Sequence, residues 1–268
     1  MLEVFSPLYD KLFYFPGDKK NYLPTDGEYS HIHKKWFQNS LGNQISIWHL
    51  TVKNPIGRVI HCHGSGDNIS SHYPHVSWLT SYGYEVIMFD YPGYGESGGT
   101  PTRESTVATA GEVIEHFTQQ VDPLPVFILG QSLGGNIASV ALTDIKKLPQ
   151  IRGVILDSMY SSFKSLGAVK IKRKYIKQSM YLLKLVASFI SDSNSPLSRA
   201  ELLNYPTLIL HSRNDKFVPY QESLNFYNQM TGEDVEFWSH LNSCHTDVLQ
   251  NNISDYPKKV VQWMRKKM

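Results

Sequence analysis

Residues 125–137 read Pro-Val-Phe-Ile-Leu-Gly-Gln-Ser-Leu-Gly-Gly-Asn-Ile, an apolar run that leads into glycines, one serine and a helix-like continuation. Gly130-Gln131-Ser132-Leu133-Gly134 matches G-x-S-x-G. Between a strand and a helix this motif predicts a nucleophile elbow, a turn that exposes the serine hydroxyl above a sheet. Both glycines are needed because a Cβ would clash where strand and helix approach each other. The pentapeptide alone also fits a tight structural turn with an incidental serine; the flanking strand and helix favour the elbow.

Short apolar runs alternate with helical periods along the rest of the chain. Residues 36–38 and 44–52 flank the turn residues 40–43, which predicts a hairpin, and apolar residues recur at helical spacing over 107–117. The continuous apolar runs lie at 59–60, 85–89, 126–129, 154–156, 207–210 and 235–238. Such runs are typical of parallel strands covered on both faces. The sequence therefore predicts an α/β fold, a doubly wound and mostly parallel sheet of about eight strands, in one domain spanning residues 1–268.

The charge and cysteine content exclude several classes of protein. A chain of 268 residues with a net charge of +2 can form one full core and is too weakly basic to indicate nucleic-acid binding. Cys62 and Cys244 give no disulfide framework, so we expect a reducing, cytoplasmic location. The first residues lack the basic and apolar segments of a signal peptide. No run of about 18 uncharged apolar residues occurs, so we expect no transmembrane segment.

Polar residues follow the expected strands, at the edge of the sheet where parallel α/β folds place their chemistry. In chain order they are His63-Gly64-Ser65-Gly66, Asp90, Ser132, Asp157-Ser158, Asn214-Asp215 and Cys244-His245. A serine hydroxyl is a weak nucleophile near neutral pH and needs a base that takes its proton. An acid fixes the tautomer of a histidine base and stabilises its charged form. The order serine, acid, histidine therefore predicts a catalytic triad.

Four segments together resemble the α/β-hydrolase superfamily, in particular its small-lid branch of esterases, acyl thioesterases and serine-aminopeptidase-like enzymes. They are residues 63–66, 89–97, 130–135 and 214–219, and residues 12–16 resemble the entry segment of that branch. The order of the segments is specific, and the likeness extends over residues 12–264. The resemblance implies the α/β-hydrolase fold with a small helical lid, and hydrolysis of carboxylic esters or thioesters without a cofactor.

The resemblance also implies a triad of Ser132, Asp215 and His245. Ser132 would attack the acyl carbon, and His245 would accept its proton and return it to the leaving group. The negative oxygen of the tetrahedral intermediate needs hydrogen-bond donors aimed at it, an oxyanion hole. One donor is the backbone N–H of Leu133, directly after the nucleophile. By resemblance, the other is the backbone N–H of Ser65.

Two of these positions have a competitor. His240 follows an expected strand, whereas His245 lies past the loop and before an expected helix, as the resemblance requires. Asp157 also ends a strand, and a minority of these enzymes place their acid there. Asp215 lies in the fuller match, next to the start of the following helix. One departure is Ser212, where the family usually has glycine, so we expect an altered turn before Asp215.

Two further patterns resemble ligand sites. Residues 93–98 match G-x-G-x-x-G, but a dinucleotide site needs the third glycine to open a helix, and here the helix is expected near Arg103. His61 and His63 share one face of a strand, which raises the question of a metal. No third ligand lies at a suitable spacing, so we expect no metal site. We expect Asp90 to be structural.

Residues 158–203 interrupt the alternation of strands and helices, so we expect them to form a small lid over the site. From Ser158 to Ser191 the segment has no acidic residue. It has basic residues at Lys164, Lys170, Lys172, Arg173, Lys174, Lys177 and Lys184, and apolar residues at helical spacing at Ile176, Met180, Leu183, Ala187 and Ile190. A lid helix with a solvated basic face explains these residues. The alternative is a lid that docks on anionic lipid or on an acyl carrier.

The sequence as a whole predicts a serine hydrolase that cleaves small-molecule carboxylic esters or thioesters through an acyl-enzyme. An amidase or aminopeptidase would use the same residues, because the acyl-enzyme chemistry is shared. A binding module that kept the fold without catalysis is a third hypothesis. The complete triad and both elbow glycines count against that hypothesis.

Overall fold

The computed structural model describes residues 11–23, 31–120, 124–174, 190–192, 194–241, 243–250 and 254–268. In this part of the chain, eight strands form one sheet in the order β1-β2-β4-β3-β5-β6-β7-β8. The strands are β1 (Ile32–Gln38), β2 (Gln44–Leu50), β3 (Gly57–Cys62), β4 (Tyr84–Phe89), β5 (Val126–Gln131), β6 (Ile151–Asp157), β7 (Thr207–Ser212) and β8 (Val235–His240). The pairs β1–β2 and β2–β4 are antiparallel and the remaining pairs are parallel. The predicted sheet and hairpin are therefore confirmed.

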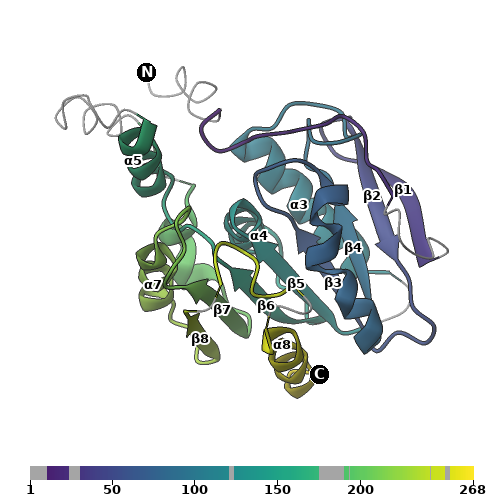
Figure 1. Ribbon diagram of the computed structural model, residues 1–268. Helices are drawn as coiled ribbons and strands as arrows, with labels where there is room; N and C mark the ends of the chain where they lie inside the picture. The colour runs from purple at the N-terminus through teal and green to yellow at the C-terminus, as the bar shows by residue number, and fades with distance from the viewer. Residues whose placement is uncertain are drawn as a thin grey trace.

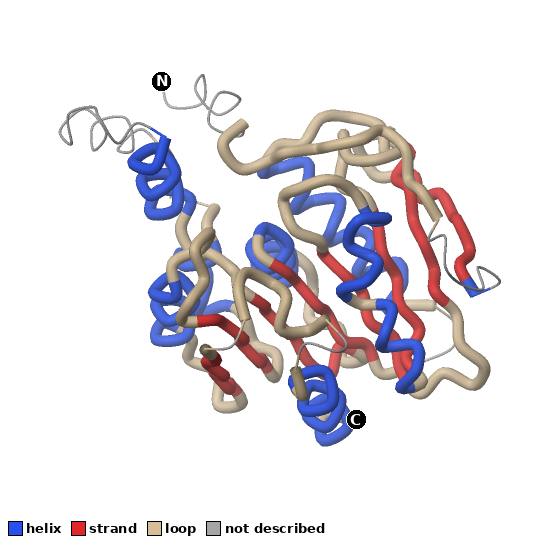
Figure 2. Tube along the Cα trace, viewed as in Figure 1, coloured by secondary structure: helices blue, strands red, loops and turns tan. Residues whose placement is uncertain are grey.

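Helices cover both faces of this sheet (Figure 1), and Figure 2 shows the strands as the layer between them. The α-helices are α2 (Ile69–His72), α3 (Arg103–Thr118), α4 (Leu133–Asp144), α5 (Phe163–Lys174), α7 (Tyr220–Gln229) and α8 (Tyr256–Lys266); the 3-10 helices are η3 (Tyr73–His75), η4 (Ser77–Tyr82) and η5 (Pro196–Leu202). Side chains of α3, α4 and α7 belong to one buried apolar cluster, and side chains of α2, η4 and α8 belong to a second. Two clusters on opposite faces are the signature of a doubly wound sheet.

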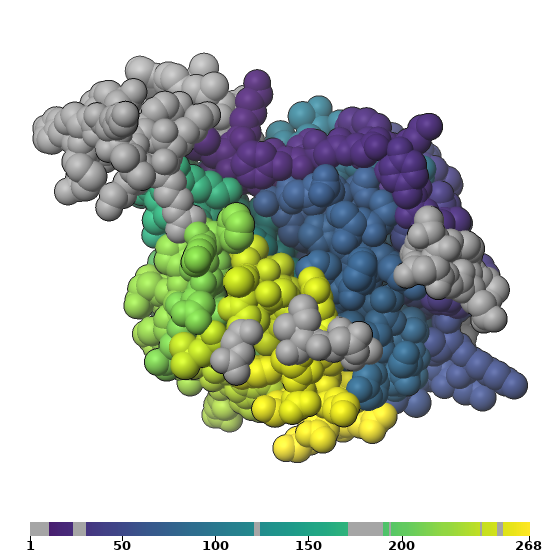
Figure 3. Space-filling model, in the orientation of Figure 1, coloured from purple at the N-terminus to yellow at the C-terminus, as the bar shows by residue number. Residues whose placement is uncertain are grey.

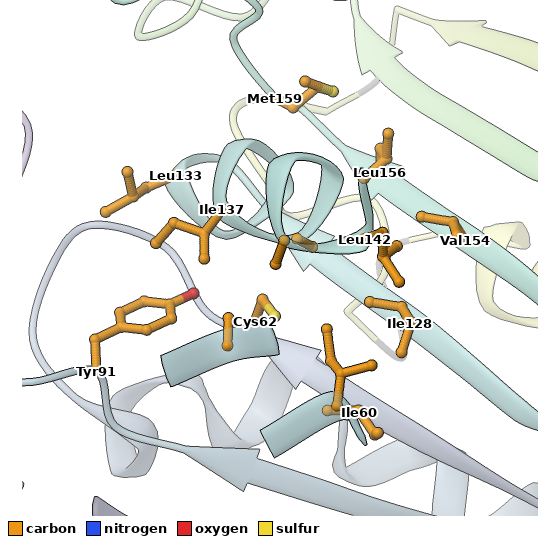
Figure 4. Close-up of a cluster of buried hydrophobic side chains, with 14 of the residues drawn as sticks. Ile60, Cys62, Tyr91, Ile128, Leu133, Ile137, Leu142, Val154, Leu156 and Met159 are labelled. Atoms are coloured by element: carbon orange, nitrogen blue, oxygen red, sulfur yellow. The ribbon is translucent and has the colours of Figure 1, made fainter. Parts of the chain in front are cut away.

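The central strands are buried on both faces. Every residue of β3, β4, β5 and β7 is buried. In β5, Ile128 belongs to the cluster under α4, whereas Phe127 and Leu129 belong to the cluster on the other face. Figure 4 shows Leu133 and Ile137 of α4 on the side of the sheet to which Ile128 contributes. Removing these apolar surfaces from water stabilises the sheet by about 25 cal/mol per Å² buried.

The chain changes direction across the sheet at β3. It passes from β3 to β4 on one side and then crosses to β5 on the other side, so β3 pairs with both. Cys62, at the end of β3, lies opposite Gly130 of β5. Loops that leave two strands at such a switch point diverge and leave room for a ligand. The segments that follow β3 and β5 are therefore the expected walls of a site.

The segment 93–98 is a turn. A backbone hydrogen bond of 2.9 Å joins its first and last residues, and the next helix begins only at Arg103. Asp90, just before this turn, accepts hydrogen bonds from the backbone N–H of Ile69 at 2.9 Å and from the side chain of Asn21 at 2.5 Å. Burial raises the pKa of Asp90 to about 6. These contacts tie the N-terminal segment and the start of α2 to the loop after β4, which supports a structural role for Asp90.

Only part of the expected lid lies within the described residues. Between β6 and β7 the structure has α5 and η5. Ile190, which lies between these two helices along the chain, is buried. The positions at 176, 180, 183 and 187 lie outside the described residues, as do Lys177 and Lys184. The lid over 158–203 thus stays a prediction. Among the described helices, none has the length and apolar character needed to cross a bilayer.

The N-terminal segment packs against the chain that follows β3. Figure 3 shows this segment, in purple, against the blue part of the chain. The ring of Phe13 lies 4.9 Å from that of Phe163 and 5.9 Å from that of Tyr160, measured between centroids. The backbone N–H of Phe15 donates to the carbonyl oxygen of Ser65 at 3.0 Å. The segment therefore links the base of α5 to the loop after β3.

Candidate active site

The turn at Ser132 has the backbone geometry of an elbow. β5 ends at Gln131, α4 begins at Leu133, and Ser132 between them has φ 53° and ψ −116°, a conformation that non-glycine residues rarely adopt. A Cβ on Gly134 would overlap the carbonyl oxygen of Cys62. The end of β3 therefore lies directly against the first turn of α4. This contact, which the predicted clash at the elbow glycines anticipated, brings the loop after β3 beside Ser132.

Ser132, His245 and Asp215 form a continuous chain of hydrogen bonds. The Oγ of Ser132 lies 2.9 Å from Nε2 of His245, and Nδ1 of His245 lies 2.6 Å from Oδ2 of Asp215. Both distances are those of direct hydrogen bonds. An imidazole placed in this way can accept the serine proton on one nitrogen while the carboxylate holds the other. The three residues that the resemblance singled out are thus neighbours in space.

Both oxygens of Asp215 accept hydrogen bonds. Oδ1 accepts the backbone N–H groups of Phe217 at 2.7 Å and Val218 at 2.9 Å. Oδ2 faces Nδ1 of His245 and, at 3.4 Å, Nε2 of the fully buried His211. Burial acts to raise the pKa of Asp215, but hydrogen bonds from His211 and His245 outweigh it and hold the pKa well below its usual range. Asp215 is therefore a carboxylate throughout the neutral range.

The competing residues lie elsewhere. Oδ2 of Asp157 accepts a hydrogen bond from the side chain of Gln131 at 2.9 Å, and burial raises the pKa of Asp157. His240 is the last residue of β8, and its Nδ1 lies 2.6 Å from the hydroxyl of Ser243. Among the described residues, neither side chain makes a hydrogen bond to the side chain of His245 or Ser132; Asp157 meets Ser132 only through the backbone, where its carbonyl oxygen accepts the Ser132 N–H at 2.9 Å. The expectation of a helix just after His245 was wrong, because residues 246–250 form turns and α8 begins further on.

Gln131, the second residue of the G-x-S-x-G motif, links the elbow to its surroundings. Its Oε1 lies 3.1 Å from Nε2 of His61. Its Nε2 donates to Asp157 and, at 3.4 Å, to the carbonyl oxygen of Thr246. Thr246 follows His245 directly, so this network connects the nucleophile turn to the histidine loop. Sequence reasoning missed Gln131 because the motif leaves this position unspecified.

Ser212 connects the acid turn to the histidine loop. Its hydroxyl donates to the carbonyl oxygen of Ser243 at 2.5 Å and accepts the backbone N–H of Asn214 at 3.1 Å. A glycine at this position would have no side chain to make either bond. The departure from the family pattern therefore adds a link between the segments that carry Asp215 and His245.

The two backbone N–H groups predicted as oxyanion donors remain available. Leu133 is the first residue of α4, so its N–H has no partner within the helix. Within the described part of the chain, the N–H groups of Leu133 and Ser65 donate to no protein acceptor. The positive end of the α4 dipole adds to the field at this point. Both predicted oxyanion donors are thus unpaired, and their role stays a prediction.

A third histidine lies beside His61 and His63, which the spacing argument did not anticipate. The ring of His72, on α2, lies 5.1 Å from that of His63 and 6.3 Å from that of His61. Burial, followed by the nearby imidazoles, lowers the pKa of both strand histidines well below its usual value. Burial also lowers the pKa of His72, to about 4. Among the described residues, no three histidine, cysteine or acidic side chains are arranged to hold a metal ion.

The chain is similar in sequence to several known proteins. The family model described as serine aminopeptidase, S33, matches residues 53–179. Uncharacterized protein YfhR of Salmonella typhi is 34% identical over 230 residues, which cover 80% of this chain and 74% of that protein. Lysophosphatidylserine lipase ABHD12 of Danio rerio is 26% identical over 258 residues, which cover 80% of this chain and 64% of that protein.

The fold has close structural neighbours. Esterase Pf2001 of Pyrococcus furiosus superimposes with a TM-score of 0.75 at 19% identity, over 96% of this chain and 97% of that chain. The α/β-hydrolase GrgF of a Penicillium species gives a TM-score of 0.70 at 15% identity over 92% of this chain. Together with the sequence relatives, these likenesses show that the chain belongs to the α/β-hydrolase superfamily of serine hydrolases.

Proposed function

We propose that the protein hydrolyses carboxylic esters or thioesters of small molecules, with Ser132 as nucleophile, His245 as general base and Asp215 as the orienting acid. The observation that carries this proposal is the hydrogen-bonded chain from Ser132 to Asp215, with contacts of 2.9 and 2.6 Å. It starts at a serine held in a strained elbow. Strain of this kind persists where the surrounding structure fixes a reactive group.

The chemistry follows from the positions of these atoms. Oγ of Ser132 bonds to the acyl carbon while its proton moves to Nε2 of His245. The former carbonyl oxygen becomes negative and accepts hydrogen bonds from the N–H groups of Leu133 and Ser65. The leaving group departs with the proton from His245, which leaves an acyl-enzyme. Water then repeats the sequence, and Asp215 stabilises the charged imidazole in both steps.

The names of the relatives support an ester as the substrate. One sequence relative is a lysophosphatidylserine lipase and one structural neighbour is an esterase. The matching family model is described as a serine aminopeptidase, which keeps an amidase or aminopeptidase as the second candidate. A non-catalytic module is the third, and the unbroken hydrogen-bond chain argues against it. Both cysteines are free, which agrees with the proposed reducing, cytoplasmic location.

A substrate panel with a nucleophile variant tests the proposal. The wild-type protein should hydrolyse p-nitrophenyl esters or acyl-CoA faster than aminoacyl p-nitroanilides, with no added metal. Ser132→Ala should lower kcat by roughly 10⁴ to 10⁶ with little change in melting temperature. Ser139→Ala is the matched control, because Ser139 lies on α4 and its hydroxyl donates to the carbonyl oxygen of Asn136 at 3.0 Å, away from the triad.

The panel can also reject the proposal. Near-wild-type turnover by Ser132→Ala would remove the triad assignment. A fluorophosphonate probe should label the wild-type protein and not the Ser132 variant. Failure to label or hydrolyse any substrate would favour the binding module, and faster cleavage of the anilides would favour the aminopeptidase.

A further inference from the structure

Every carbonyl oxygen in the loop 63–66 accepts a hydrogen bond. The donors are the hydroxyl of Tyr91 to His63 at 2.9 Å, Nδ1 of His63 to Gly64 at 2.7 Å, the hydroxyl of Tyr94 to Ser65 at 2.9 Å together with the N–H of Phe15, and Nε2 of His72 to Gly66 at 2.9 Å. All but the Phe15 donor are side chains. A loop held at each carbonyl has few alternative backbone conformations. Its N–H groups are therefore fixed as well, because each peptide unit is planar.

One of these bonds acts on the predicted oxyanion donor. In a trans peptide the C=O and N–H of the same unit point in opposite directions. The unit that joins Gly64 to Ser65 contains the carbonyl oxygen of Gly64 and the N–H of Ser65. Whatever holds the Gly64 oxygen therefore sets the direction of the Ser65 N–H.

We propose that His63 is a positioning residue for the oxyanion hole. By donating from Nδ1 to the Gly64 oxygen, it aims the Ser65 N–H at the oxygen that becomes negative beside Ser132. This inference rests on the proposed function. It gives a buried side chain outside the triad a part in transition-state stabilisation.

The protonation of His63 fits this role. A carbonyl oxygen can only accept, so the Nδ1 that lies 2.7 Å from it must carry the proton. Nε2 is then unprotonated, and within the described residues it has no hydrogen-bond partner; Oδ1 of Asp90 is 4.0 Å away. Burial, with His72 and His61 nearby, favours the neutral ring by lowering its pKa. The donor therefore stays in one tautomer over the range in which the enzyme would work.

The packing of the ring holds the donor in place. His63 is fully buried, and its ring lies 4.2 Å from the ring of Tyr91 and 5.1 Å from that of His72, at interplanar angles of 31° and 32°. Two tilted aromatic rings at these distances leave the buried imidazole little freedom to rotate. Its Nδ1 is therefore as fixed as the backbone that it holds.

Gly64 explains why such a bond is needed. Glycine lacks a Cβ, so rotation of the peptide unit that follows it meets little steric resistance. A rotated unit would turn the Gly64 oxygen, instead of the Ser65 N–H, toward the developing negative charge. The two would repel each other. The hydrogen bond from His63 opposes that rotation.

Three substitutions at this one position test the inference. His63→Asn places an amide N–H₂ the same number of bonds from the backbone as Nδ1, so it can keep the hydrogen bond. His63→Leu has nearly the shape of asparagine without a donor. His63→Gln carries the same amide one bond further out, beyond the position of Nδ1. Comparing His63→Asn with His63→Gln keeps the polarity of the side chain and changes the position of the donor. Comparing His63→Asn with His63→Leu keeps the shape and removes the donor.

We expect kcat to fall in the variants that have no hydrogen-bond donor at the position of Nδ1. On a p-nitrophenyl ester, His63→Leu and His63→Gln should lower kcat by about 10- to 100-fold, below the full loss of an oxyanion donor, and leave KM within about twofold. His63→Asn should stay within about fivefold of wild type. A trifluoromethyl ketone, which forms a tetrahedral adduct on Ser132, should bind more weakly in step with kcat. If His63 had only a structural role, the variants would lower the melting temperature, and kcat would not separate His63→Asn from His63→Leu and His63→Gln.

Two outcomes would overturn the inference. Equal kcat values for His63→Asn and His63→Gln would show that a donor at Nδ1 does not matter, even if His63→Leu failed to fold. Full activity of a folded His63→Leu would show the same. Both are distinguishable from failure of the proposed function, in which the wild-type protein itself would not turn over any ester or react with the ketone.

Discussion

Asp157 ends β6 and Asp215 follows β7, but the two carboxylates are held by different partners. Asp215 contacts His245 at 2.6 Å, whereas Asp157 contacts the side chain of Gln131. Loss of the orienting carboxylate costs on the order of 10⁴ in kcat in the serine-protease case. We expect Asp215→Asn to show that loss and Asp157→Asn to affect mainly stability. Steady-state kinetics and melting temperatures of both variants check this, and the reverse pattern of rates would place the acid at the end of β6.

The same two aspartates should show opposite pH effects on stability. The pKa of Asp215 is lowered in the folded protein, so its charge contributes stability that is present above the unfolded pKa, near 3.9, and lost as pH falls toward the folded value. The unfolding free energy of wild type should therefore be higher than that of Asp215→Asn. The difference should be largest near pH 7 and should shrink below about pH 4.

Asp157 is the control, because its charge should have the opposite effect on the unfolding free energy. Burial raises its pKa, so its charge costs stability at neutral pH and the cost disappears as it is protonated. Relative to Asp157→Asn, wild type should gain stability as pH falls. Urea titrations at pH 7 and at about pH 3.5 measure both differences. Parallel trends for the two variants would contradict the pKa directions.

At the scale of elements, the contact between β3 and α4 leaves no room at the elbow. A Cβ on Gly134 would overlap the backbone carbonyl of Cys62, and backbone at the end of a central strand cannot move aside. Overpacking commonly costs about 1–3 kcal/mol. We expect Gly134→Ala to reach at least the upper end of that range and to lose most activity.

Gly98→Ala provides the comparison for that variant. A Cβ on Gly98 would meet its nearest neighbour at 3.8 Å, an ordinary contact. Its unfolding free energy should therefore stay close to that of wild type in urea titrations. Equal stability of the two alanine variants would mean that β3 and α4 are less closely packed than the Gly134 contact indicates.

The elements that were predicted well are those with a local pattern. The elbow, the hairpin and the central strands follow from glycine positions and apolar runs within a few residues. His211 and His72 could not be found in this way, because each matters through a neighbour on another element: His211 through the Asp215 carboxylate and His72 through the loop after β3. The i, i+4 spacing of His211 and Asp215 was the one local hint. The order of the strands in the sheet depends on contacts between distant segments, so no short stretch of sequence predicts it.

At the scale of the whole molecule, the basic lid stays a prediction that charge reversal can test. Replacing Lys172, Arg173 and Lys174 by glutamate should raise KM for acyl-CoA or for anionic vesicles and leave kcat on a neutral p-nitrophenyl ester unchanged. The attraction is screened over about 8 Å at physiological ionic strength, so the wild-type preference should weaken as salt is raised. The three residues lie at the end of α5.

A matched variant separates a local field from net charge. Lys258→Glu, Lys259→Glu and Lys266→Glu change the net charge equally on exposed positions of α8. This triple variant should leave KM for acyl-CoA unchanged. Identical kinetics of the two triple variants on anionic and neutral substrates would favour the simpler account, a solvated face of the lid.

The pairing of β3 with β5 has a consequence for how activity is acquired during folding. Cys62 and Gly130 are opposite each other in the sheet but far apart along the chain, and the elbow contact depends on their pairing. Closing such a loop costs entropy before any hydrogen bond repays it, which makes long-range parallel pairing slow. After dilution from urea, hydrolysis should therefore reappear with the slowest tryptophan-fluorescence phase and never ahead of it. A chain in which β3 and β5 have not yet paired would lack the elbow contact, and with it a serine able to act on the esters around it.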